Sequence, residues 1–300
     1  MSGSKTGAGS ELIVRLKGGL GNQLFEYAAA RALALRNDAA LKLDAISGFA
    51  YDHQYQRSLK LDSFSIQAAY ADRRESFCDL LGRPRRVMAR ALGRRYVDDS
   101  GGFTSSDMRS LRFTGTIYLD GLWQNQAFFS DYEEIVRRDL AFKAAPSAET
   151  EELRDAIESS ESVSVHVRRL FIPPGASRPV PVEDDVPIPW LTRRPYYEAA
   201  IESFRGRVPN PHFFVFSDHP DWARRNLRFP GKATYVEERK GDNQDVTDLR
   251  LMTSCRHHIV SASTFSWWGA WLRGSGVGHV CAPRDGWAFP GMPLSAWTVL

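Results

Sequence analysis

The sequence is poor in cysteine, in long apolar runs and in net charge, and each shortage narrows the classes of protein it can encode. Its three cysteines, Cys78, Cys255 and Cys281, have neither metal-ligand spacing nor an even count. Reduced thiols in a cytoplasmic protein are therefore expected. No apolar run reaches the ~18 residues of a membrane span. A net charge of +3 is too small to indicate nucleic-acid binding by itself.

The chain has the size and apolar content of one large domain or two ordinary ones, since 43% of its 300 residues are hydrophobic. Residues 1–10 are rich in glycine and serine without an apolar core, which predicts a disordered leader and not a signal peptide. Polarity rises near 144–147. We therefore predict an N-terminal domain over 11–146 and a C-terminal domain over 147–300.

Short apolar segments alternate with amphipathic ones, which predicts a parallel, doubly wound α/β architecture. The expected strands are 11–16, 41–44, 116–123, 162–167, 212–216, 234–236 and 258–261. The expected helices cover about 24–35, 127–140, 151–159 and 245–255, with others beginning at Pro195, at Pro220 and after Ser266. In open parallel sheets, ligands bind beyond the carboxyl ends of the strands.

The expected strand 162–167 runs directly into Arg168 and Arg169. Two guanidinium groups at a strand end can bind a phosphate or a carboxylate in a bidentate manner. A solvated arginine pair that closes the strand is the alternative. The last expected strand leads through 262–266 into a tryptophan-rich helix, whose N-terminal hydroxyls and N–H groups suit an anion. An ordinary helix cap is the alternative there, but the two features together predict a diphosphate cradle.

A glycine-rich loop, 17–23, separates the first expected strand from the first helix. Gly18, Gly19 and Gly21 fit neither the dinucleotide fingerprint nor the Walker lysine pattern, although such a loop allows backbone N–H groups to approach a ligand. A plain tight turn is the alternative. Asn22 is expected to cap the helix.

Two further stretches have unusual compositions. Residues 171–190 include six prolines, which predicts a long loop. The arginines between Arg83 and Arg95 suit an acidic partner or an anionic membrane surface, with a solvated helical face as the alternative. Nucleic acid is not predicted, because no aromatic residues are interleaved with these arginines. Nothing in the sequence specifies an oligomeric state.

Taken in order, several segments resemble the α-1,2-fucosyltransferase family of GDP-fucose-dependent enzymes. The matching segments are Gly18-Gly-Leu-Gly-Asn-Gln-Leu-Phe25, Tyr118-Leu-Asp-Gly121 with Trp123-Gln124, His166-Val-Arg-Arg169, Tyr196-Tyr197, Phe216-Ser-Asp218, Asp248-Leu-Arg-Leu-Met252 and Ser263-Thr-Phe-Ser-Trp-Trp-Gly-Ala-Trp271. They span most of the chain. The arginine pair is shared with other fucosyltransferases.

The resemblance implies a GT-B-like fold, in which two Rossmann-like domains face a cleft and the second holds the nucleotide. It implies an inverting transfer of L-fucose from GDP-β-L-fucose to a galactoside hydroxyl of a surface glycan, forming an α-1,2 linkage. GDP-fucose is then a substrate and no cofactor is implied. The implied transfer is independent of metal, and the sequence contains no Asp-x-Asp tripeptide.

The resemblance also implies roles for individual residues. Arg168 would contact the β-phosphate, Asn22 would approach the sugar–phosphate junction, and Asp120 is a candidate base beside Asp52 and Glu26. The other expected donor-binding residues are Gly19, Gly21, His166, Asp218, Ser263, Thr264 and Phe265. The expected acceptor-binding residues are Trp123 and Gln124. Trp190 is a further candidate from the proline-rich segment itself, as a stacking platform for a sugar ring, with a surface insertion that does not contact substrate as the alternative.

One departure from the family pattern lies directly after the arginine pair. The family continues with Gly-Asp-Tyr, whereas this chain has Leu170, Phe171 and Ile172, and so lacks a carboxylate that would brace the loop. Two alternatives therefore stay open. One is a transferase that uses another GDP-sugar or another acceptor, and the other is a catalytically weakened homologue that binds a GDP-sugar.

Overall fold

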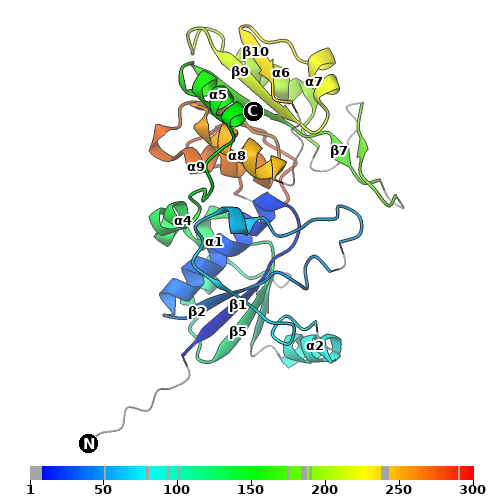
Figure 1. The fold of residues 1–300 in the computed structure, drawn as a ribbon, viewed down its shortest axis with the longest axis vertical. Helices are drawn as coiled ribbons and strands as arrows, with labels where there is room; N and C mark the ends of the chain where they lie inside the picture. The colour runs from blue at the N-terminus through cyan, green and yellow to red at the C-terminus, as the bar shows by residue number, and fades with distance from the viewer. Residues whose placement is uncertain are drawn as a thin grey trace, which may run out of the picture. The chain divides into compact units, whose positions relative to one another are not determined.

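A computed structural model of the chain describes residues 9–50, 52–78, 81–92, 95–99, 102–173, 176–183, 188, 191–237, 243–289 and 291–300. The chain divides into two compact units, Met1–Lys143 and Ala144–Leu300 (Figure 1). Each unit contains a parallel sheet with helices, so the expected α/β class is confirmed. No helix in the described ranges combines the length and the apolar character needed to cross a membrane.

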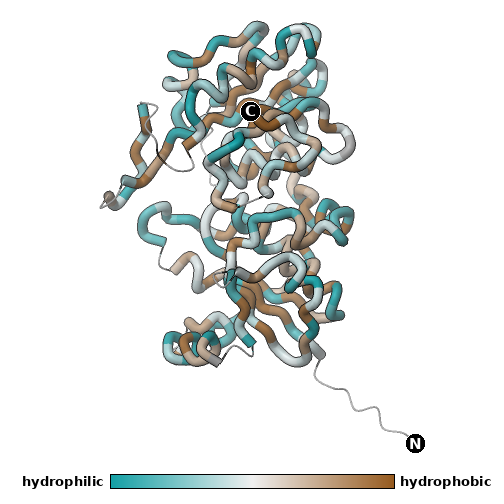
Figure 2. Tube along the Cα trace, turned by 180° about the vertical axis from the view of Figure 1, so that it is seen from behind, coloured by the Kyte–Doolittle hydropathy of each residue, from teal (hydrophilic) through white to brown (hydrophobic). Residues whose placement is uncertain are grey.

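The first unit is built on a five-stranded parallel sheet in the order β3-β2-β1-β5-β4. Its strands are β1 (Glu11–Arg15), β2 (Ala40–Asp44), β3 (Ala69–Tyr70), β4 (Tyr96–Asp98) and β5 (Thr116–Asp120). Leu12, Ile13 and Val14 of β1 are buried, as a central strand covered on both faces requires. Figure 2 shows these central strands as a hydrophobic layer.

The helices of this unit are α1 (Leu20–Arg36), α2 (Gly82–Leu92), α3 (Ser105–Ser110) and α4 (Glu133–Asp139), with 3₁₀ turns η1 (Leu61–Ser63), η3 (Gln126–Phe128) and η4 (Ser130–Tyr132). The helix expected over 127–140 is therefore divided into two 3₁₀ turns and a short α-helix. Asn125 accepts a hydrogen bond from the N–H of Ala127, which favours a tight turn. Phe129 leaves helical geometry and packs against Phe25.

The second unit has a six-stranded parallel sheet in the order β10-β9-β6-β11-β12-β13. Its strands are β6 (Ser162–Val167), β9 (His212–Ser217), β10 (Lys232–Tyr235), β11 (His257–Ile259), β12 (Val280–Ala282) and β13 (Thr298–Val299). The helices are α5 (Ala148–Glu158), α6 (Arg194–Glu202), α7 (Pro220–Asn226), α8 (Gln244–Ser254) and α9 (Thr264–Arg273), followed by the 3₁₀ turn η5 (Gly274–Gly276).

Alternation along β9 supplies a core on each face of this second sheet. Phe213 and Val215 pack in the cluster that includes Tyr197 of α6 and Trp222 of α7. Phe214 and Phe216 pack instead with residues of α5 and α8, among them Ile157 and Leu251. Because successive side chains of a strand point to opposite faces, α6 and α7 cover one face and α5 and α8 the other. The doubly wound arrangement is confirmed.

The strand β11 ends two residues before the expected Ser261, because the N–H of Ser263 turns back to the carbonyl of Ser261 at 2.7 Å. The proline-rich segment is not entirely loop. Within it, β7 (Leu170–Phe171) pairs antiparallel with β8 (Val180–Pro181). Pro181 has no N–H to donate and is tolerated because this two-stranded ribbon is all edge.

Candidate functional site

The carboxyl ends of β6 and β11 bring together His166 and Phe265, which belong to two separate sequence motifs. The two rings lie 5.5 Å apart between centroids, and Nδ1 of His166 is 2.8 Å from Oγ of Ser261. Burial lowers the pKa of His166 to about 3, and the nearby positive charge of Arg168 adds to this effect. The imidazole is therefore neutral at pH 7. It can take part in hydrogen bonding but contributes no charge.

The N-terminus of α9 lies in the same region. Ser263 is its N-cap, and its hydroxyl accepts a hydrogen bond from the N–H of Phe265 at 3.3 Å. Ser263 thus performs the ordinary capping role, and Thr264 begins the helix half-buried. Trp267, Trp268 and Trp271 are buried and anchor α9 to the second unit. The helix consequently presents the positive end of its dipole beside His166.

The two arginines after β6 have different surroundings. Arg169 is fully buried, its Nε donates to the carbonyl of Val182 at 2.9 Å, and its guanidinium lies 3.9 Å from the ring centroid of Trp222. Arg168 is half-buried, and among the described residues no hydrogen bond or ion pair engages its guanidinium. Arg169 therefore braces the protein, whereas Arg168 is the arginine available to an anion.

A carboxylate does brace this loop, although it comes from a different strand than in the family pattern. Asp218 directly follows β9, and its two oxygens accept from the backbone N–H groups of Arg169 at 2.6 Å and Leu170 at 3.2 Å. This contact joins the ends of β6 and β9, which are adjacent in the sheet. Sequence reasoning missed this bracing role. The available signal was an aspartate at the end of a neighbouring buried strand.

The segment after the arginine pair is also held by α7. The carbonyl of Glu183 accepts from Nε1 of Trp222 at 2.8 Å, and its carboxylate pairs with His219 at 2.8 Å and Arg225 at 2.6 Å. The backbone N–H of Val182 donates to the carbonyl of Arg169 at 2.9 Å. These contacts fix β8 without the family aspartate. Trp190, expected as a stacking platform, lies outside the described residues.

In the first unit, the glycine loop joins β1 to α1, and its geometry corrects the role of Asn22 as a helix cap. The N-cap is Gly19, which has no side chain to cap with, and Asn22 already lies within the helix. Its Oδ1 accepts from Nε2 of Gln124 at 2.9 Å. Gly18 has a φ of +74°, and a Cβ there would lie 2.6 Å from Nδ2 of Asn22. The loop therefore requires glycine at 18 and brings Asn22 and Gln124 together.

Trp123 does not offer an open surface to an acceptor. Only 1% of its surface is exposed, and its ring packs edge-on against Phe103 and Phe128. Gln124, the next residue, is also buried and reaches the glycine loop through Asn22. The acceptor-binding role expected of Trp123 therefore stays a prediction, and in this structure its ring has a packing role.

The carboxylates suggested as bases are all engaged by the protein. Asp120 is bound by Nζ of Lys17 at 3.0 Å, by Arg15 at 3.3 Å and by the hydroxyl of Tyr96. Burial acts to raise its pKa, but these partners outweigh burial and lower the pKa to about 2. A base this weak is a poor proton acceptor near pH 7.

Glu26 and Asp52 are both held by backbone N–H groups. Glu26 is fully buried beneath the glycine loop and accepts the N–H of Lys17 at 2.9 Å. Its burial raises its pKa well above the ordinary value. The oxygens of Asp52 accept the N–H groups of Tyr55 and Arg57, each at 3.0 Å, and so shape a turn.

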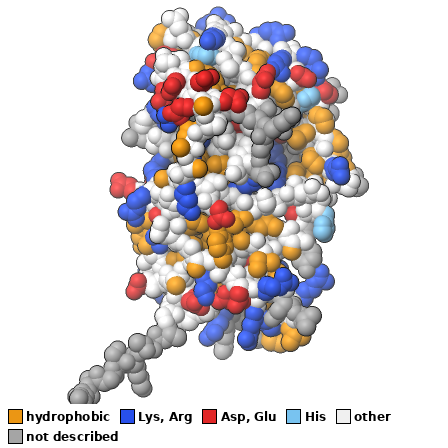
Figure 3. Space-filling model, in the orientation of Figure 1, with side chains coloured by type: hydrophobic (Ala, Val, Ile, Leu, Met, Phe, Trp, Pro, Cys, Tyr) orange, Lys and Arg blue, Asp and Glu red, His pale blue; other side chains and the backbone are white. Residues whose placement is uncertain are grey.

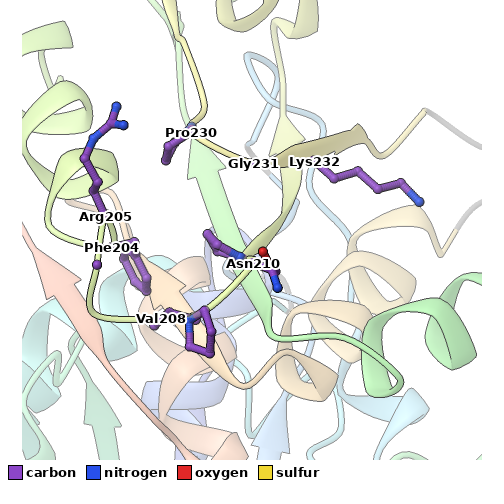
Figure 4. A pocket seen from close by; sticks show the side chains of 10 residues that line it. Phe204, Arg205, Val208, Asn210, Pro230, Gly231 and Lys232 are labelled. Atoms are coloured by element: carbon purple, nitrogen blue, oxygen red, sulfur yellow. The ribbon is translucent and has the colours of Figure 1, made fainter.

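A cavity of about 430 Å³ lies elsewhere in the second unit, at the amino ends of β9 and β10 (Figure 4). It is lined by residues of the 204–211 segment and by Pro230, Gly231 and Lys232. Ligands of parallel α/β sheets bind at the opposite, carboxyl ends of the strands. This cavity is therefore separate from the cluster around His166. Within the described ranges, no group of three or more histidine, cysteine or acidic side chains could hold a metal ion.

Comparison with known proteins agrees with the expected family. The sequence profile of glycosyl transferase family 11 matches residues 95–284. The α-1,2-colitosyltransferase of Escherichia coli is 30% identical over 289 residues, which are 91% of each protein. Galactoside α-(1,2)-fucosyltransferase 1 of Homo sapiens is 28% identical over 170 residues, 52% of this chain and 43% of the human protein.

Among solved structures, the fucosyltransferase NodZ from Bradyrhizobium has a similar fold, with a TM-score of 0.53. The match covers 91% of this chain and 94% of NodZ at 15% sequence identity. Neutral His166, the positive end of α9 and the available Arg168 lie in the matched part of the second unit. The chain therefore belongs to glycosyl transferase family 11 and is a glycosyltransferase.

Proposed function

We propose that this glycosyltransferase moves L-fucose from GDP-β-L-fucose to a galactoside hydroxyl of a surface glycan and forms an α-1,2 linkage with inversion. The proposal rests on one arrangement. Arg168 is half-buried, its guanidinium has no hydrogen bond or ion pair to the described residues, and it lies close enough to His166 to affect the pKa of that imidazole, while the His166 ring lies 5.5 Å from that of Phe265 in the first turn of α9. The human relative named as a galactoside α-(1,2)-fucosyltransferase supports the sugar and the linkage.

A second donor has a specific observation in its favour. The relative that is 30% identical over 91% of this chain transfers colitose, which is L-fucose without its 3-hydroxyl group. A pocket that hydrogen-bonds a hydroxyl discriminates strongly against the analogue lacking it, whereas an apolar pocket discriminates little. GDP-colitose is therefore the alternative donor, and direct competition between the two sugars distinguishes them.

The proposed chemistry places charge where the second unit can stabilise it. As the bond between the anomeric carbon and the β-phosphate oxygen breaks, the leaving GDP gains negative charge and the sugar becomes oxocarbenium-like. Arg168 would donate to the β-phosphate, while the N–H groups and Thr264 hydroxyl at the start of α9 would line the diphosphate. The acceptor hydroxyl would attack the opposite face of the anomeric carbon and release its proton to water.

The remaining donor residues are assigned more modest roles. Neutral His166 would supply a hydrogen bond near the diphosphate and no charge. Gly19 and Gly21 would let the glycine loop approach the sugar. Asp218 would hold the Arg168 loop in place through its contacts to Arg169 and Leu170, in addition to the donor-binding role expected of it. Because Asp120 is bound by two cations, we assign it to the support of the first unit.

The experiment that tests the donor class is a thermal-shift and turnover panel. GDP is expected to raise the melting temperature, whereas UDP and CMP leave it unchanged. GDP-fucose or GDP-colitose is expected to be consumed with a lactose acceptor, and EDTA is expected to have no effect. Equal stabilisation by all three nucleotides would contradict the guanine assignment, and loss of turnover in EDTA would contradict metal independence.

The Asn22–Gln124 hydrogen bond supplies a second prediction. We propose that Gln124 holds the Asn22 amide in position toward the sugar–phosphate junction, so Asn22→Ala and Gln124→Ala should each lower kcat/KM by about tenfold or more. Because both variants break the same hydrogen bond, the double variant should be little worse than either single variant.

A matched control for this pair is Gln126→Ala, which removes a similar hydrogen bond to Glu133 in the same unit. It should retain wild-type kcat/KM. If the Asn22 and Gln124 variants keep wild-type kcat/KM as well, the pair only closes the turn. Melting temperatures measured in parallel separate loss of fold from loss of positioning.

A further inference from the structure

The helix α2 does not follow the usual division of a surface helix into a buried apolar face and an exposed polar face. Arg85 and Arg86 face the protein, with their guanidinium groups 5.5 and 5.7 Å from the ring centroid of Phe77. Val87 and Met88 face solvent instead and are 69% and 62% exposed. A surface helix of a water-soluble protein normally buries its apolar stripe and exposes its charges. The solvent-facing side of α2 therefore exposes apolar side chains that an apolar partner would cover.

The exposed apolar residues around α2 form one patch. Leu81, immediately before the helix, is 65% exposed, and Pro84 and Ala91 are exposed on the same face as Val87 and Met88 by helical periodicity. Leu81, Val87 and Met88 are the three most exposed large hydrophobic side chains among the described residues. We call these five residues the α2 apolar face.

Positive charge surrounds this face. Between residues 73 and 95 the sequence has eight arginines against one glutamate and one aspartate, a balance of 8 − 2 = +6 in a chain whose total is +3. Arg83 and Arg90 border the α2 apolar face, and Arg90 also pairs with Asp98 at 2.9 Å. In Figure 3, Lys and Arg side chains gather with hydrophobic ones at the lower right, where Figure 1 places α2.

We propose that α2 is a membrane-docking helix, which rests on an anionic lipid surface and inserts Leu81, Val87 and Met88 among the lipids. An amphipathic helix with apolar residues on one face and arginines beside them is the ordinary form of an interfacial anchor. The arginines gain energy from anionic headgroups. Nucleic acid would use the arginines but leave the apolar face without a partner, because no aromatic residue lies on it to stack with a base.

The test is flotation of the full chain with vesicles. Wild-type protein should float with equimolar phosphatidylglycerol and phosphatidylcholine, and not with phosphatidylcholine alone. The double variant Val87→Ser with Met88→Ser should bind the anionic vesicles about tenfold more weakly or worse, because it removes inserted apolar surface. Arg83→Gln should weaken binding by about fivefold, the effect of one arginine at an anionic surface.

The matched control is Val299→Ser with Leu300→Ser, which removes two adjacent apolar side chains that are each 36% exposed in the second unit. This variant should float like wild type. Turnover with a water-soluble acceptor should be unchanged in all variants, because none of these residues belongs to the proposed catalytic machinery. That measurement also shows whether each variant is folded.

Four results would overturn the proposal. The first is absence of wild-type protein from anionic vesicles, and the second is vesicle binding that is unaffected by the Val87 and Met88 changes. The third is a dimer in sedimentation without lipid that the same double variant dissociates, which would assign the α2 apolar face to a second copy of the chain. The fourth is RNA binding that is equally strong in wild type and in the double variant, together with no vesicle binding, which would assign the arginines to nucleic acid.

Discussion

Arg168→Ala is expected to lower kcat by about 100- to 1,000-fold while leaving the melting temperature unchanged. A decrease of this size is usual when an enzyme loses one preorganised hydrogen-bond donor at a position where charge develops in the transition state. Stability should be preserved because no hydrogen bond or ion pair to the described residues engages this guanidinium. Steady-state turnover with a GDP-sugar and an acceptor measures the effect, and differential scanning fluorimetry verifies the fold.

Two neighbouring substitutions provide the controls. Arg168→Lys keeps the charge but loses the planar fork of donors, so its turnover should lie between wild type and the alanine variant. Arg169→Ala should lower the melting temperature instead, because it empties the space over Trp222 and leaves the carbonyl of Val182 without its donor. Turnover of Arg168→Ala within about threefold of wild type would contradict the role of a phosphate donor.

Asp120→Asn is expected to destabilise the first unit by about 2–3 kcal/mol at pH 7. It removes the charge that Lys17 and Arg15 share, and the cost is below that of a fully buried pair because the Lys17 side chain is 29% exposed. The pKa of Asp120 is about 2 when folded, against about 3.9 for an unfolded aspartate. A carboxyl group whose pKa is lowered by folding stabilises the protein at pH values above its pKa in the unfolded state. That stabilisation is lost as the pH falls through its pKa in the folded state.

The difference in the free energy of unfolding between wild type and Asp120→Asn should therefore have its full size above about pH 4. It should vanish as the pH approaches 2. Urea unfolding curves at several pH values measure it. A general base would behave differently. If Asp120→Asn unfolds at the wild-type urea concentration and has lost turnover, then Asp120 is catalytic and the supporting role is wrong.

The central strands could be predicted because burial on both faces leaves a continuous apolar signal. Glu11–Arg15 and His212–Ser217 are of this kind and were expected almost to the residue. Short edge strands carry no such signal. Ala69–Tyr70 and Thr298–Val299 have two residues each, too few for a periodic pattern to emerge.

The site was predictable in its motifs and less so in its internal contacts. The juxtaposition of His166 and Phe265 follows from strand order, since motifs at the ends of neighbouring parallel strands meet at one edge. Arg169 braces the protein and leaves Arg168 available to an anion because Arg169 contacts Trp222 and Val182. These two residues are distant in sequence from the arginine pair. The burial of Trp123 likewise depends on how Phe103 and Phe128 pack around it, which residue type alone does not specify.

The order of the strands has a consequence for synthesis on the ribosome. All five strands of the first sheet lie within Met1–Lys143, so every pairing partner in it exists before the second unit is translated. At about 5–20 residues per second, the following Ala144–Leu300 takes on the order of 10–30 s to appear. The first unit therefore has time to fold while its successor is still being made. In the second sheet, by contrast, β6 lies between β9 and β11, so its central strand waits until His257–Ile259 has left the exit tunnel.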